Sequence, residues 1–106
     1  SSIVNVGAEN TRRIDIQIGI GYSSDIPKAK KLLEQVINSE KGILKDKDIL
    51  VVVKSLDESC VTLETRAWVN TADYWNVRFN LLERYKNIFD ENGIEIPFNQ
   101  LDVHMK

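Results

Sequence analysis

Four isoleucines at every second position constrain this chain more than any other feature of its sequence. They are Ile14, Ile16, Ile18 and Ile20. Polar residues and glycines occupy the positions between them. Because successive side chains of a strand point to opposite sides, this alternation predicts a β-strand over residues 13–22 with one buried face. The rest of the chain must therefore supply apolar elements that cover the isoleucines.

A helix is predicted directly after this strand. Ser23, Ser24 and Asp25 supply an N-cap, and Pro27 is tolerated in the first helical turn. The next apolar residues recur at helical spacing and form one stripe: Ile26, Ala29, Leu32, Leu33, Val36 and Ile37. Gly42 is the predicted end of the helix.

Two further strands are predicted to form an antiparallel hairpin. Residues 49–56 are rich in β-branched side chains, and we expect them to be buried on much of both faces. Apolar and polar residues alternate again over residues 61–69, and the turn between the two strands is short. The polar face of the sheet should then carry Asp15, Gln17, Thr62, Glu64, Arg66 and Trp68.

A second, longer helix is predicted to start at Asn70 or Thr71 and to end in a left-handed cap at Asn92 and Gly93. Its apolar stripe comprises Tyr74, Val77, Leu81, Tyr85 and Ile88, widened by Leu82 and Phe89. Alternation resumes over residues 94–96. Pro97 cannot donate a ladder hydrogen bond, so this strand is expected at a sheet edge.

The predicted order of strand, helix, strand, strand, helix and strand is the ferredoxin-like βαββαβ pattern of an α+β domain. Right-handed crossovers would place both helices on one face of an antiparallel sheet. A last alternation predicts an additional C-terminal strand. It comprises Gln100, Leu101, Asp102, Val103, His104 and Met105.

Composition and motifs argue against catalysis. One cysteine and one histidine cannot build the usual zinc site, and Cys60 and His104 lie on different predicted strands. A net charge of -2 disfavours nucleic acid as a partner. No apolar run approaches the length of a membrane helix. We therefore predict no catalytic, cofactor-binding or metal-binding residues, and we expect Cys60 to pack as a small hydrophobe.

One pattern resembles a nucleotide site. Gly19, Gly21 and Ser24 stand between a strand and a helix, as in a dinucleotide-binding fingerprint. Asp25 occupies the start of the helix, where its charge would repel phosphate. We interpret the two glycines as thinning the open face of the sheet instead.

Several short motifs follow one another along the chain, at residues 12–13, 21–26, 43–46, 66–74, 81–84, 89–90, 93–94 and 96–100. In this order they resemble the cytoplasmic C-terminal region of the mechanosensitive channel of small conductance family. The resemblance runs from about Thr11 to Lys106, nearly the whole chain. Asn99 departs from it, because family members often carry a second proline there.

The resemblance implies a domain of a membrane pore that opens under bilayer tension and releases ions and small osmolytes. It implies a ring of seven identical subunits in the inner membrane, with this domain in a cage on the cytoplasmic side. Residues 1–11 would then be the end of a preceding β-domain or a linker, and residues 12–98 the ferredoxin-like domain. Residues 99–106 would be an assembly strand that joins a barrel with its copies.

The chain begins without methionine, and the resemblance implies that membrane helices precede it. Alone, it is expected to be monomeric or weakly associated. Two other functions stay open from the residues themselves. One is a stand-alone ferredoxin-like regulatory domain that binds a small molecule, and the other is a small acyl- or phosphoryl-processing enzyme. A saturable thermal shift would favour the first, and turnover of a phosphate ester the second.

Overall fold

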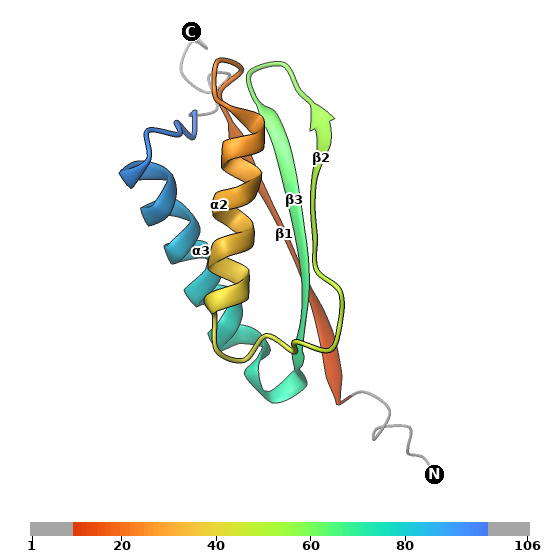
Figure 1. Ribbon diagram of the computed structural model, residues 1–106. Helices are drawn as coiled ribbons and strands as arrows, with labels where there is room; N and C mark the ends of the chain where they lie inside the picture. The colour runs from red at the N-terminus through yellow and green to blue at the C-terminus, as the bar shows by residue number, and fades with distance from the viewer. Residues whose placement is uncertain (1–9, 98–106) are drawn as a thin grey trace, which may run out of the picture.

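Two helices lie side by side on one face of a three-stranded antiparallel sheet (Figure 1). The structure is a computed structural model and describes residues 10–97. Its elements are β1 (Thr11–Ile20), α2 (Ile26–Ser39), β2 (Leu50–Leu56), β3 (Val61–Asn70), the short 3-10 helix η1 (Thr71–Asp73) and α3 (Tyr74–Glu91). The predicted α+β class and the placement of both helices on one face are confirmed.

The central strand of the sheet is β3, in the order β1-β3-β2. β1 pairs with it antiparallel along its whole length, from Thr11 opposite Asn70 to Ile20 opposite Val61. β2 pairs with the other edge of β3, as the hairpin prediction required. β1 and β2 are therefore parallel, and α2 connects them across β3 in a split βαβ arrangement.

The isoleucine face of β1 lies under the helices, as predicted. Ile14, Ile16 and Ile20 are buried, and Ile18 is partly buried against the same core. The other large, fully buried side chains come from both helices and β3: Leu33, Val36, Ile37, Val61, Leu63, Val69, Leu81, Tyr85 and Phe89. One continuous core therefore fills the space between the sheet and the two helices.

The start of α2 follows the prediction, but its end does not. The Asp25 carboxylate accepts a hydrogen bond from the Lys28 backbone N–H at 3.0 Å, which is the predicted N-cap. The helix ends at Ser39, before Gly42. Gly42 has a φ of 92°, and a Cβ there would come within 2.8 Å of Val77 Cγ2. Gly42 therefore does not end the helix. It allows the loop after α2 to pass close to α3.

The end of α3 is a Schellman motif, as the predicted left-handed cap required. Gly93 has a φ of 76°. Its N–H donates to the Asp90 carbonyl at 3.4 Å, and the Ile94 N–H donates to the Phe89 carbonyl at 2.9 Å. Ile94 and Phe89 are both buried, which is the hydrophobic contact that accompanies this motif. The turn therefore brings the chain back towards the core.

Residues 94–96 do not form the predicted fourth strand. The Gly21 N–H donates to the Glu95 carbonyl at 3.1 Å, just beyond the end of β1. The Schellman turn buries Ile94, and Pro97 has no N–H to continue a ladder. The segment therefore runs past the end of β1 without pairing along it. The predicted assembly strand lies outside the described residues, as does His104.

Two predictions of burial are wrong. β2 was expected to be buried on much of both faces, but Leu50, Val53 and Leu56 are exposed. β2 is an edge strand, so nothing within the described residues pairs with its outer edge. Leu82 was expected to widen the buried stripe of α3, yet it is 41% exposed. It lies on the side of α3 that faces away from the core.

One hydrogen bond inside the core joins α3 to the central strand. The hydroxyl oxygens of Tyr85 and Thr65 lie 2.8 Å apart, and both residues are buried. Burial raises the pKa of Tyr85 to about 12, although the bond to Thr65 acts in the opposite direction. The neutral phenol is therefore the form that the fold accommodates.

We predict that Leu81→Ala lowers the free energy of unfolding by about 2–5 kcal/mol, because it leaves a cavity between α3 and the sheet. Leu82→Ala is the matched control, since it removes the same atoms from the neighbouring exposed position. Denaturant melts of the two variants check this. Equal losses would contradict the assignment of the two faces of α3.

We also predict that stability falls as the pH rises from about 10 to about 12. In this window the unfolded chain loses the Tyr85 proton first, because its pKa is lower there than in the folded state. Below a pH of about 10, the raised pKa of Tyr85 contributes its full amount to the free energy of unfolding, which is at most about 3 kcal/mol. Urea melts across this range should show a smaller fall for Tyr85→Phe than for the parent chain. Parallel curves would refute the prediction.

Candidate functional site

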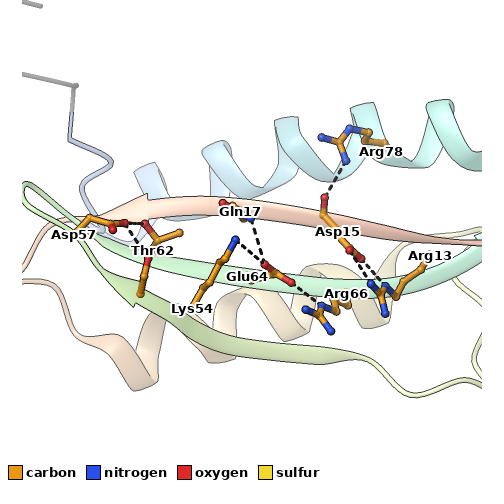
Figure 2. A network of polar contacts seen from close by, with 10 residues as sticks. Arg13, Asp15, Gln17, Lys54, Asp57, Thr62, Glu64, Arg66 and Arg78 are labelled. Carbon is orange, nitrogen blue, oxygen red and sulfur yellow. Dashed lines mark hydrogen bonds and ion pairs between the residues drawn. The ribbon is translucent and has the colours of Figure 1, made fainter. Parts of the chain in front are cut away.

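The sheet face opposite the helices carries a network of charged and polar side chains (Figure 2). Glu64 of β3 lies at its centre. Its Oε2 accepts from Arg66 Nε at 2.6 Å, and its Oε1 accepts from Gln17 Nε2 at 3.3 Å and lies 3.8 Å from Lys54 Nζ. The Glu64 side chain is only 6% exposed. Since Gln17, Lys54 and Arg66 belong to β1, β2 and β3, this one carboxylate links all three strands.

A second ion pair lies along β1. Arg13 Nε is 2.7 Å from Asp15 Oδ1, and the second arm of the same guanidinium donates to Asp15 Oδ2 at 3.0 Å. The hydrogen bond to Asp15 and its charge raise the pKa of Arg13. Arg78 of α3 donates to the Asp15 backbone carbonyl at 3.0 Å, as Figure 2 shows. α3 is thereby tied to β1.

Asp57 closes the turn between β2 and β3. Its carboxylate accepts hydrogen bonds from the hydroxyls of Thr62 and Ser55, and these bonds lower the pKa of Asp57. Its backbone N–H donates to the Cys60 carbonyl at 2.9 Å, and the Tyr22 hydroxyl donates to its carbonyl. The carboxylate is therefore engaged in holding the turn.

The candidates for nucleotide chemistry have structural roles. A Cβ on Gly19 would lie 2.8 Å from Cys60 Sγ, so Gly19 makes room for the thiol. Cys60 is partly exposed, and its sulfur lies 3.8 Å from Thr62 Oγ1. Asp25 caps the start of α2, so a carboxylate occupies the helix N-terminus. Gly19 thus thins the open face, as interpreted from the sequence, but Gly21 lies beyond the end of β1, and a Cβ there would meet no atom closer than 3.8 Å.

A shallow cleft of about 450 Å³ lies between the end of α2 and the start of α3. On its wall, Arg84 donates to Glu40 Oε1 at 2.9 Å, and Asn80 donates to Glu40 Oε2 at 3.3 Å. Arg84 also donates to Ser39 Oγ at 2.6 Å. Both oxygens of the buried Glu40 carboxylate are thus used to hold the two helices together.

Three large apolar side chains are exposed along α3, and we call them the α3 stripe. They are Trp75, Phe79 and Leu82, which are 56%, 59% and 41% exposed. Their spacing places them on one side of the helix, and the rings of Trp75 and Phe79 have centroids 5.8 Å apart. The sequence prediction missed this surface. The sequence nevertheless contained a signal for it. Trp75 and Phe79 are aromatic residues four positions apart, and the predicted core stripe of this helix included neither of them.

Three more apolar side chains are exposed on β2: Leu50, Val53 and Leu56, which are 38%, 37% and 69% exposed. They lie on two faces of the strand. Leu50 pairs with Arg66 on the charged face of the sheet, whereas Val53 and Leu56 pair with the buried Leu63 and Val61 on the helix side. Figure 1 shows β2 and α3 at opposite sides of the domain. The described residues therefore expose an apolar stripe on α3, separate apolar side chains on β2 and a charged sheet face.

Residues 10–97 contain no group of three or more His, Cys, Asp or Glu side chains that could hold a metal ion. Within the same range, neither helix combines the length and the apolar character that crossing a bilayer requires. Every buried side-chain nitrogen or oxygen among these residues has a hydrogen-bond partner. The polar groups of the described domain thus hold its own elements together.

Comparison with known proteins gives a consistent result. The model of the family described as "Mechanosensitive ion channel MscS, C-terminal" matches residues 14–96. The chain belongs to the MscS family. Over 98% of its length it is 38% identical to the small-conductance mechanosensitive channel of Edwardsiella ictaluri, and over its whole length it is 37% identical to that of Helicobacter pylori.

Two solved structures share the fold of this chain. The crystal structure of Helicobacter pylori MscS in its closed state covers 97% of this chain with a TM-score of 0.84 and 36% sequence identity. Arabidopsis thaliana MSL1 covers 91% with a TM-score of 0.75, although the identity is only 16%. The chain spans 36% of the length of the Edwardsiella relative and 39% of that of the Helicobacter relative. The chain thus covers little more than a third of each of these two relatives.

We predict that Glu64→Ala lowers the free energy of unfolding by about 1–3 kcal/mol, because it leaves Arg66 and Lys54 without their shared carboxylate. Asp15→Ala is the matched control on the same face. Its ion pair with Arg13 is far more exposed, so a much smaller loss is expected. Thermal and urea melts of both variants check this. A loss for Glu64→Ala no larger than that for Asp15→Ala would show that the network does not link the strands.

Proposed function

We propose that this chain is the cytoplasmic cage domain of a channel that opens under membrane tension and releases ions and small osmolytes. The observation that carries the proposal is the family match over residues 14–96. The TM-score of 0.84 to Helicobacter pylori MscS at 36% identity supports it. The channel belongs to the inner membrane, and this domain lies on its cytoplasmic side.

The domain acts as a scaffold and has no catalytic role. The buried carboxylates support this, because Glu40 is used between the two helices and Glu64 between the three strands. Asp57 is engaged by the hydroxyls of Thr62 and Ser55. A general acid or base needs a carboxylate that can reach a substrate proton, and these groups serve the fold instead.

In the assembled channel, seven identical subunits form the ring. Residues 12–98 make up the ferredoxin-like domain of each subunit. The segment after α3 runs past the end of β1, where the Gly21 N–H donates to the Glu95 carbonyl, and it forms no fourth strand. Residues 1–11 connect to a preceding β-domain, and membrane helices stand before it.

Residues 99–106 form the assembly strand, which pairs with its copies in a parallel barrel. Its residues are Gln100, Leu101, Asp102, Val103, His104 and Met105. A closed ring of strands leaves no edge unpaired. The barrel is too small to hold the subunits together by itself, so the isolated chain is monomeric or weakly associated in dilute solution.

A chimeric channel tests the function. The matching C-terminal part of the Edwardsiella ictaluri channel is replaced by this chain, and single-channel currents are recorded from membrane patches under suction. We expect currents that open with tension, as in the parent channel. The control is the same channel without its C-terminal part. A chimera that reaches the membrane in normal amount but never opens under tension would reject the proposal.

A further inference from the structure

We propose that Asn92 is a site of spontaneous deamidation, at which the side-chain amide becomes a carboxylate, and that this change loosens the turn that ends α3. The proposal concerns the covalent chemistry of the chain itself and does not depend on the proposed function. It rests on the residue that follows Asn92, on the exposure of that residue and on the contacts of the Asn92 amide.

The reaction needs an asparagine whose following backbone nitrogen can reach its side chain. The Gly93 nitrogen gives up its proton and attacks Asn92 Cγ, so that a new N–Cγ bond forms and the Cγ–Nδ2 bond breaks. Ammonia leaves with that proton, and a cyclic imide remains. Water then opens the imide at one of its two carbonyls, which gives an aspartate or an isoaspartate. One ammonia is lost and one water is gained, so a carboxylate replaces the amide.

Asn92 is followed by glycine, unlike the other asparagines of the chain. A side chain on the following residue hinders closure of the ring, and glycine has none. Gly93 is exposed, and a Cβ added to it would meet no heavy atom within 4 Å outside the adjacent residues. The surroundings of Gly93 therefore leave room for the base and the water that the two steps need.

The turn around Asn92 has to open briefly for the ring to close. In the imide, Cβ, Cα and the carbonyl carbon of Asn92 lie close to one plane with the Gly93 nitrogen, and the ψ of 10° at Asn92 keeps them out of it. The Gly93 N–H is held only by a long bond of 3.4 Å to the Asp90 carbonyl. Helix ends open at a lower free energy than the core. The opening of this turn therefore sets the rate of the reaction.

Two other exposed asparagines lie on the helices and lack this combination. Asn87 is exposed on α3, but it is followed by Ile88 within the same helix. Asn38 is exposed on α2 and is followed by the small Ser39, which is still helical. In a helix, the following N–H donates to a carbonyl four residues earlier, and this bond fixes ψ. Both residues are therefore internal comparisons for Asn92.

A carboxylate at position 92 cannot make the contact that the amide makes. Asn92 Nδ2 donates to the Ile88 carbonyl at 2.8 Å. An ionised carboxylate has no proton to donate, and its charge would lie at the helix C-terminus, which is already partially negative. Lys28 Nζ donates to the Asn92 backbone carbonyl at 3.1 Å, so its ammonium offsets only part of that repulsion.

The isoaspartate product changes the backbone as well. Its main chain passes through the side-chain carbons, so one more methylene separates the Cα at position 92 from the Gly93 nitrogen. The hydrogen bonds that Gly93 and Ile94 donate in the Schellman motif depend on that spacing. Their loss releases the buried Ile94 from the core. The segment whose Glu95 carbonyl accepts from Gly21 is then no longer fixed at the end of β1.

Peptide mapping by mass spectrometry tests the site. The chain is kept in warm, mildly alkaline buffer and then cleaved after Lys86, which leaves Asn87 and Asn92 on one fragment. We expect Asn92 to convert about tenfold faster than Asn87, which corresponds to about 1.4 kcal/mol in activation free energy. Asn38 should convert as slowly as Asn87. Equal rates at Asn87 and Asn92 would overturn the proposal.

Hydrogen exchange tests the effect on the turn. The Asn92→Asp variant carries the carboxylate from the start, and Asn92→Gln is the control that keeps an uncharged amide. We expect the Ile94 N–H to exchange about tenfold faster in Asn92→Asp than in the parent chain, because its bond to Phe89 opens more often. The converted fraction of the aged parent chain, separated by its added negative charge, should behave in the same way. Unchanged exchange at Ile94, or an equal increase in Asn92→Gln, would overturn the loosening of the turn.

Discussion

The antiparallel pairing of β1 with β3 is the interaction on which the rest of this domain depends. It runs without interruption from Thr11 opposite Asn70 to Ile20 opposite Val61. A shift by one residue would turn the isoleucines to solvent and the charged residues into the core. The different chemistry of the two strand faces therefore favours this register. With the register set, Thr65 faces Tyr85 of α3, and Glu64 faces the opposite side. The helix layer and the polar network are both consequences of this one pairing.

Charged side chains in this domain serve its architecture. Glu64 joins three strands, Glu40 joins two helices, and Arg78 fastens α3 to β1. A buried carboxylate is stable when charged partners and donors surround it, and removing those partners is costly. The same arrangement leaves such groups unsuited to proton transfer. This use of charge agrees with membership in a family of channels, in which the domain has a mechanical and assembly role by our proposal.

Several large apolar side chains of the domain lie outside its core and are exposed. The core is closed by Leu81, Tyr85 and Phe89 on one side of α3, yet Trp75 and Phe79 extend the apolar character of the helix to its outer side. α3 therefore carries more apolar surface than the core of the domain buries. Together with the exposed apolar side chains of β2, these residues leave apolar surface outside a core whose own residues are buried.

The sequence by itself determined the two helices, the three strands, the hairpin and the caps at Asp25 and Gly93, because alternation, helical spacing and capping are local properties of the chain. It also determined which side of β1 faces the core. Only the tertiary structure decided that residues 94–96 leave the sheet, since that depends on where the turn after α3 places Ile94. It likewise decided that Leu82 of α3 and Leu50, Val53 and Leu56 of β2 are exposed and that Glu64 is buried. Burial depends on which neighbour covers a side chain, and one strand or helix does not contain that information.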